Sequence, residues 1–178
     1  EDGTETDLDL GTYERAIHRN LTKDSSLTSG KIFKSIIDKE RKGEYLGRDV
    51  QFIPHVTGEI KSFIRTLAIK DTPDIIIIEV GGTVGDLENS YFLEAMRELK
   101  YEEGRENVIF VNVTYIFEPP TLGEQKSKAA QLGVQKLMSL GVQPDILVCR
   151  ANNEVKESIK EKLSMVANLP VKNIISLK

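Results

Sequence analysis

The chain has 178 residues, of which 39% are hydrophobic and 29% charged, a composition typical of a folded globular protein. Its net charge of −4 supplies no overall basic field for binding a nucleic-acid backbone, so no nucleic-acid partner is expected. One cysteine and two histidines exclude a disulfide framework and the usual zinc clusters, and no run approaches the roughly 20 apolar residues of a membrane helix. We therefore expect a cytoplasmic protein without a membrane partner.

The predicted elements alternate between helices and short strands. In chain order, the predicted helices cover 31–41, 59–69, 90–99, 127–140 and 155–166, and the predicted strands cover 50–53, 75–80, 108–113, 145–149 and 173–177. This alternation is typical of βαβ units, so the predicted fold is α/β, with a mainly parallel sheet flanked by helices. The strands are almost wholly apolar, as strands covered on both faces should be.

At this length a single domain covering residues 1–178 is expected. The chain starts with an acidic, turn-rich stretch at 1–7 rather than with methionine, and it stops directly after the predicted strand 173–177. These features predict a domain that is incomplete at both ends.

The run 74–86 places Glu79 at the end of a predicted strand, with Gly81, Gly82 and Gly85 following. Ligands in open α/β sheets bind beyond the carboxyl ends of strands, so Glu79 is a candidate Mg²⁺ ligand opposite nucleotide phosphates. The glycines would let backbone amides approach a ligand closely. The alternative is a solvent-facing glutamate above an ordinary turn.

A second acidic candidate is the pair Asp7 and Asp9, which would share one face if this stretch is extended. One of them could then join Glu79 at a metal ion. Acidic residues before a helix also favour the helix dipole, and this alternative stays open.

A third candidate is the stretch 123–131, in which Lys126 and Lys128 flank Ser127 before a predicted helix. Free backbone amides, the helix dipole and the two lysines could together bind phosphate, although lysines in a loop are usually only solvated. Cys149 lies inside an apolar strand and is expected to be structural. His18 and His55 have no partner that spacing assigns.

Several separate stretches, in the same order along the chain, resemble the synthetase (amidoligase) domain of the CTP synthase family. The matching stretches are 7–15, 21–24, 28–31, 39–47, 50–57, 79–88, 123–131 and 141–150. The resemblance implies an α/β domain of the P-loop type, similar to dethiobiotin synthetase. It also implies a ligase that makes CTP from UTP: ATP phosphorylates the uracil 4-oxygen, and ammonia then displaces the phosphate.

The resemblance implies site residues by position. Asp9 and Glu79 correspond to two Mg²⁺ ligands, with Asp9, Arg150 and Lys178 near the ATP. The residues that correspond to the UTP and CTP site are Asp86, Leu87, Glu88, Lys126, Ser127, Lys128, Ala129, Ala130, Gln131 and Lys162. The first three are implied chiefly in binding the product CTP as a feedback inhibitor. In the family these contacts can cross a subunit interface, so a homotetramer is implied, and ammonia comes from a separate glutaminase domain.

The chain departs from the family pattern in two places. The family usually has Lys-Thr-Lys-Pro-Thr-Gln in the lysine loop, whereas Ala129 here lacks the fixed φ of proline and Ala130 lacks a hydroxyl. Val166 stands where an aromatic residue often lies against the inhibitor.

No stretch of the 178 residues resembles the glycine-rich phosphate loop of the family, and none resembles its glutaminase. This polypeptide alone is therefore expected neither to hydrolyse ATP nor to make CTP. Two alternatives stay open: a related ligase of the dethiobiotin synthetase type, and a non-catalytic module for binding pyrimidine nucleotides or for assembly.

Overall fold

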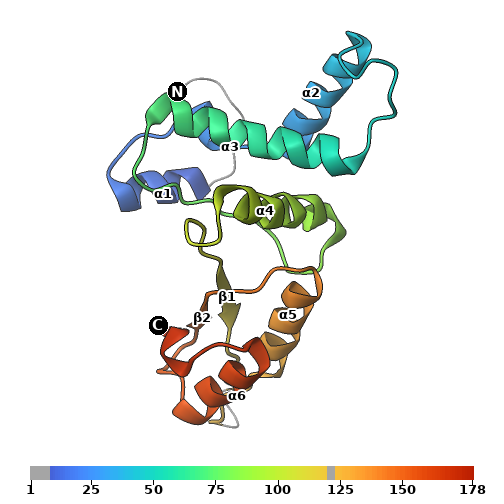
Figure 1. Ribbon diagram of the computed structural model, residues 1–178. Helices are drawn as coiled ribbons and strands as arrows, with labels where there is room; N and C mark the ends of the chain where they lie inside the picture. The colour runs from blue at the N-terminus through green and yellow to red at the C-terminus, as the bar shows by residue number, and fades with distance from the viewer. Residues whose placement is uncertain (1–8, 120–122) are drawn as a thin grey trace. The chain divides into compact units, whose positions relative to one another are not determined.

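The computed structural model describes residues 9–119 and 123–178, which fall into two compact units, Glu1–Glu79 and Val80–Lys178 (Figure 1). Asp7 and Leu8, which belong to the stretch 7–15 that resembles the family, lie outside the described residues. None of the helices in the described part of the chain has the length and apolar character that a membrane crossing demands. That residues 1–178 form a single domain stays a prediction.

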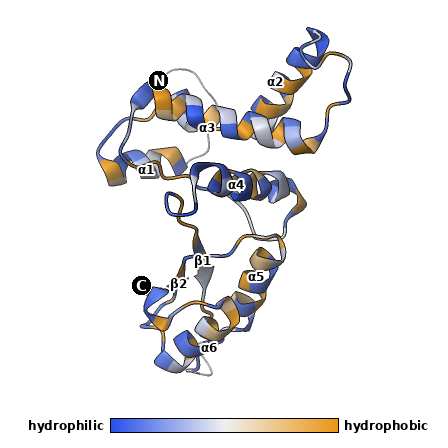
Figure 2. Ribbon diagram, in the orientation of Figure 1, coloured by the Kyte–Doolittle hydropathy of each residue, from blue (hydrophilic) through white to orange (hydrophobic). Residues whose placement is uncertain are grey.

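The described part of the first unit contains three α-helices, α1 (Asp9–Ile17), α2 (Ser29–Arg41) and α3 (Thr57–Asp71), together with short helical turns. Apolar and polar residues alternate along α2 and α3 (Figure 2), and each helix buries part of its apolar side. The Thr28 hydroxyl caps α2 by accepting a hydrogen bond from Lys31 N at 3.3 Å. The predicted helices 31–41 and 59–69 are confirmed.

An ion pair joins α2 to α3. Glu59 accepts hydrogen bonds from Lys39 Nζ at 2.5 Å and from Ser35 Oγ at 2.6 Å. Burial alone would raise the pKa of Glu59, but the hydrogen bonds from Lys39 and Ser35 outweigh it and lower the pKa below its ordinary value. Lys39 lies in one of the stretches that match the family, and its contact with Glu59 gives it a structural role.

Two predicted strands are wrong. Residues 75–80 form no strand, and the side chains of Ile75 and Ile77 are 79% and 88% exposed. A strand needs a hydrogen-bonded neighbour from elsewhere in the chain, which local composition cannot supply, and none of the described strands pairs with this segment. The prediction that Glu79 ends a strand falls with it.

The predicted strand 50–53 is replaced by an irregular helical turn, Phe52–Val56. Gln51 O accepts hydrogen bonds from His55 N and Val56 N, at 3.2 and 3.4 Å, so the backbone bonds are local and do not form a ladder. The Gln51 backbone N–H in turn donates to His55 Nδ1 at 2.9 Å.

The second unit is a parallel three-stranded sheet with helices. Its elements are α4 (Ser90–Glu103), β1 (Val111–Tyr115), α5 (Lys128–Ser139), β2 (Ile146–Arg150), α6 (Glu157–Ala167) and β3 (Ile174–Leu177). The strand order is β1-β2-β3, with Val113 opposite Val148 and Val148 opposite Ile175. The α/β class, with a parallel sheet flanked by helices, is confirmed.

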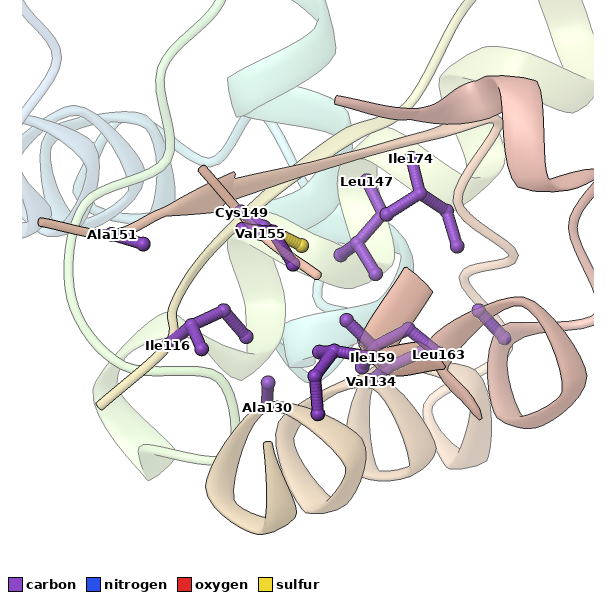
Figure 3. Close-up of a cluster of buried hydrophobic side chains, with 11 residues drawn as sticks. Ile116, Ala130, Val134, Leu147, Cys149, Ala151, Val155, Ile159, Leu163 and Ile174 are labelled. Carbon is purple, nitrogen blue, oxygen red and sulfur yellow. The ribbon is translucent and has the colours of Figure 1, made fainter. Parts of the chain in front are cut away.

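The core of this unit lies between the sheet and the helices α5 and α6 (Figure 3). Leu147 and Cys149 of β2 point into it and meet Val134 of α5 and Leu163 of α6. Burial raises the pKa of the Cys149 thiol to about 11, so it stays protonated at neutral pH. Cys149 is therefore a structural thiol, as its place in an apolar strand predicts.

Candidate functional site

A cavity of about 350 Å³ opens at the carboxyl ends of β1 and β2, where parallel sheets bind ligands. Four lysines line it together with Ser127 and Gln131, and we call it the lysine pocket; the lysines are Lys126, Lys128, Lys156 and Lys162. Lys126 comes from the loop between β1 and α5, and Lys128 is the first residue of α5. Lys156 directly precedes α6, and Lys162 lies within it.

Backbone pairing continues past the end of β1 and sets the course of the first loop. Ile116 N donates to Arg150 O at 2.8 Å, and Lys126 N donates to Phe117 O at 2.7 Å. Phe117 and Lys126 form an antiparallel bridge, and α5 begins two residues after Lys126. Ser127 precedes the helix with its side chain buried, and its hydroxyl accepts a hydrogen bond from Gln131 Nε2 at 3.0 Å.

The N-terminal ends of two helices meet at the lysine pocket. α5 begins at Lys128, and α6 begins at Glu157, directly after Lys156. The backbone N–H groups of a first helical turn lack partners within the helix and carry positive partial charge. Ser158, Ile159 and Lys162 line the cavity from one side of α6. Both helix ends therefore add to the attraction for an anion.

The charge of the lysine pocket is strongly positive, because four lysines are opposed by one lining glutamate, Glu124. Lys126 Nζ lies 2.5 Å from Glu124 Oε2, and this hydrogen bond is the main cause of the lowered pKa of Glu124. The more distant charges of Lys156 and Lys162 lower that pKa further. An anion with several negative charges could displace Glu124 and be shared among the lysines.

The structure brings together five of the ten residues implied for UTP and CTP, namely Lys126, Ser127, Lys128, Gln131 and Lys162. Ala129 and Ala130 do not line the cavity. The Ala130 side chain is only 1% exposed and packs in the core, whereas that of Ala129 is exposed.

Replacing Ala130 with threonine, the residue usual in the family, is expected to destabilise this chain. The larger side chain would place a methyl and a hydroxyl in a packed core, at a cost of about 1 to 3 kcal/mol. Thermal unfolding followed by circular dichroism measures the effect. Ala129→Thr, at the adjacent exposed position, is the matched control and should leave the unfolding midpoint almost unchanged. Equal midpoints for the two variants would contradict this placement of Ala130.

Asp86, Leu87 and Glu88 lie away from the lysine pocket. The preceding Gly85 packs against Lys136, since a Cβ added at Gly85 would lie 3.2 Å from Lys136 Cε. Lys136 is eight residues after Lys128 in α5, about 12 Å along the helix axis from the end that faces the cavity. Asp86 closes its own turn, with its Oδ2 accepting from Thr83 N at 3.2 Å.

Two of the three positions implied in ATP contact, Arg150 and Lys178, lie at the same edge of the sheet. Arg150 ends β2 and pairs in register with Leu177 of β3, after which comes Lys178. Lys178 Nζ lies 3.8 Å from Glu154 Oε2, in the loop that leads to α6. Both cations therefore stand at the carboxyl ends of two adjacent parallel strands, β2 and β3.

Asp9 and Glu79 both belong to the first unit and have exposed side chains. Asp9 is the first residue of α1, where an acidic side chain interacts favourably with the helix dipole. This is the role that the alternative to metal binding predicts for an acidic residue at this end of a helix. Among the described residues, no group of three or more His, Cys, Asp or Glu side chains could hold a metal ion. A pair of carboxylates remains compatible with Mg²⁺, which is usually bound through one or two carboxylates, substrate phosphates and waters.

The predicted site residues leave out five residues that line the lysine pocket: Glu124, Gln125, Lys156, Ser158 and Ile159. The signal for Lys156 and Ser158 is their place after a predicted strand and at the start of a predicted helix, as for Lys126 and Lys128. Glu124 and Gln125 lie within the candidate stretch 123–131, but the sequence does not show that the Gln125 side chain is buried, because a buried amide is recognised only from its contacts.

Comparison with known proteins finds similarity to CTP synthases along the whole chain. The family model described as "CTP synthase N-terminus" matches residues 1–178. The CTP synthases of Thermococcus gammatolerans and Pyrococcus horikoshii are each 51% identical over 176 residues, which is 99% of this chain. That of Clostridium perfringens is 49% identical over 175 residues.

The chain spans about a third of the length of these relatives, between 32% and 33%. The match to the family model nevertheless covers all 178 residues, and it supports the P-loop type of α/β fold expected from the resemblance. The match to the family model and the identity to these relatives show that the chain belongs to the CTP synthase N-terminus family.

Proposed function

We propose that the chain supplies the pyrimidine-nucleotide site of a CTP synthase, a C–N ligase that aminates UTP to CTP at the expense of ATP. The observation that carries the proposal is the lysine pocket, where four lysines and two helix N-termini converge at the carboxyl ends of β1 and β2. A triphosphate carries several negative charges in a row and suits such a site.

In this proposal the lysine pocket binds the triphosphate and does not read the base. UTP and CTP share the triphosphate, so substrate and product compete for the same lysines. Discrimination between the bases falls to other residues, for which we propose Asp86, Leu87 and Glu88. Because these residues lie by the far end of α5, we propose that they act at the lysine pocket of another subunit, within a homotetramer.

For the ATP site we propose Asp9 and Glu79 as Mg²⁺ ligands and Arg150 and Lys178 as cations near the phosphates. Bound Mg²⁺ would neutralise phosphate charge as the γ-phosphoryl group moves to the uracil 4-oxygen. The carboxylates of this chain would hold and orient the metal–nucleotide complex. We further propose that ammonia comes from glutamine through a separate glutaminase domain, and that the protein is cytoplasmic.

The full-length protein is expected to form CTP when supplied with UTP, ATP, Mg²⁺ and ammonia, as measured by chromatography of the nucleotides. The polypeptide 1–178 alone is expected to form none, because its sequence has no stretch resembling the glycine-rich phosphate loop. A full-length protein that binds UTP but makes no CTP would favour a non-catalytic binding module. A protein that neither binds UTP nor makes CTP would favour a ligase with another substrate.

A further inference from the structure

Gln125 is a buried polar side chain, 5% exposed, that joins the two lysine-bearing segments of the lysine pocket. Its Nε2 donates hydrogen bonds to Glu118 Oε1 at 2.7 Å and to Glu154 O at 2.9 Å. Its Oε1 accepts a hydrogen bond from Lys156 N at 2.9 Å. Both amide protons are therefore used inside the protein, and neither is left for a ligand.

Two of these partners belong to one short backbone segment. Glu154 O and Lys156 N are the carbonyl and the amide that a neighbouring strand would pair with, and the Gln125 side chain takes the place of such a strand. Lys126 follows Gln125 in the sequence, and α6 begins directly after Lys156. The amide therefore fixes the spacing between the loop before α5 and the start of α6.

Glu118 fixes the orientation of this amide. One carboxylate oxygen accepts from Gln125 Nε2, while the other accepts from Asn153 N at 3.2 Å and from Asn153 Nδ2 at 3.1 Å. Because Glu118 offers only acceptors when ionised, the NH₂ end of Gln125 must face it and the carbonyl end must face Lys156. A chain of side chains thus links the loop after β1 to the loop after β2.

We infer that Gln125, oriented by Glu118, is a positioning residue that holds Lys126 and Lys128 at the distance from Lys156 and Lys162 at which one triphosphate contacts both pairs. The inference rests on the proposed function of the lysine pocket. Lysines held in place by the protein bind a polyanion more tightly than mobile lysines do. Their side chains lose conformational entropy when the protein folds, so less entropy is lost when the ligand binds.

The first test is Gln125→Met in the full-length protein, which keeps the side-chain length and removes all three hydrogen bonds. The KM for UTP is expected to rise about tenfold, the effect of weakening one or two charge-assisted contacts. The KM for ATP and kcat at saturating UTP should change by less than about twofold. Combined with Lys162→Met, the effect on the KM for UTP should be less than additive, since Gln125 acts through the lysines.

The second test exchanges the side chains of Glu118 and Gln125. It remains informative if the Gln125→Met variant does not fold. Gln125→Glu alone sets two carboxylates against each other and should impair UTP binding at least as strongly as Gln125→Met. In the double variant E118Q/Q125E an amide again faces a carboxylate, with the roles reversed, and Lys156 N keeps an acceptor, although Glu154 O loses its donor. Part of the UTP affinity lost in Gln125→Glu should therefore return. Failure of the exchange to restore any UTP affinity would overturn the inference.

The outcomes separate this inference from the proposed function. If Lys162→Met raises the KM for UTP while Gln125→Met leaves it unchanged, the inference is overturned and the proposed function stands. A lower unfolding temperature without a change in UTP dependence would likewise make Gln125 merely structural. If Lys162→Met also leaves the UTP dependence unchanged, the proposed function itself fails.

Discussion

Replacing Glu79 with alanine in the full-length protein is expected to lower the turnover of ATP-dependent CTP formation by about a hundredfold or more. The reason is the loss of one of two proposed carboxylate ligands for Mg²⁺, without which phosphate charge is poorly neutralised as the phosphoryl group moves. Because the Glu79 side chain is exposed, the fold should survive the change, and the unfolding temperature should stay within a few degrees of the unmodified protein.

The matched control is Asp74→Ala, which removes another exposed carboxylate from the same segment. This variant should retain near-normal turnover, because no metal contact is proposed for Asp74. Steady-state kinetics over a range of Mg²⁺ concentrations compares the two variants. Near-normal turnover of Glu79→Ala, or an equal loss in both variants, would remove Glu79 from the proposed metal site.

Replacing Lys162 with methionine is expected to raise the KM for UTP about tenfold to a hundredfold. Methionine keeps most of the apolar stem of lysine and removes the charge, so the loss reports one charge-assisted phosphate contact, worth about 1.5 to 3 kcal/mol. The KM for ATP should be little changed, because Lys162 lines the lysine pocket and is proposed for UTP alone. Raising the salt concentration should reduce the difference in the KM for UTP between this variant and the unmodified protein, because salt screens the lysine charge.

The control for this prediction is Lys160→Met, two residues earlier in α6. Lys160 does not line the lysine pocket, and its Nζ lies 3.6 Å from Glu154 Oε1 and 3.9 Å from Glu157 Oε2. Its loss should leave the UTP dependence within about twofold. An equal rise in the KM for UTP in both variants would show a general effect of charge and would contradict a specific contact by Lys162.

Helix positions could be predicted from the sequence because helices depend on contacts that are local in the chain. The apolar spacing at 59–69 and at 155–166 is found again in α3 and α6, with shifts of at most two residues at the ends. Three strands could be predicted because each is followed or preceded by such a helix in a βαβ order.

The strand predicted for the apolar run 75–80 does not form, for a reason that the local sequence cannot reveal. Its composition fits a covered strand, but a strand forms only where another segment offers a ladder of hydrogen bonds. The argument that placed Glu79 at a strand end used this step, so the assignment of Glu79 now depends on the resemblance to the family.

Part of the lining of the lysine pocket could be predicted from the sequence. Lys126 and Lys128 are marked by their place at the start of a helix, and Lys162 by the resemblance to the family. Lys156 was missed although its place after a strand is equivalent. The burial of Ala130 in the core could not be predicted, because a loop motif does not tell which of its side chains turns inward.

Cryo-electron microscopy of the full-length protein with bound UTP tests the central claim most directly, because it locates the triphosphate. The predicted result is density for the phosphates in the lysine pocket, within hydrogen-bonding distance of Lys126, Lys128 and Lys162. UTP bound with its phosphates elsewhere, and this cavity holding only water, would contradict the account.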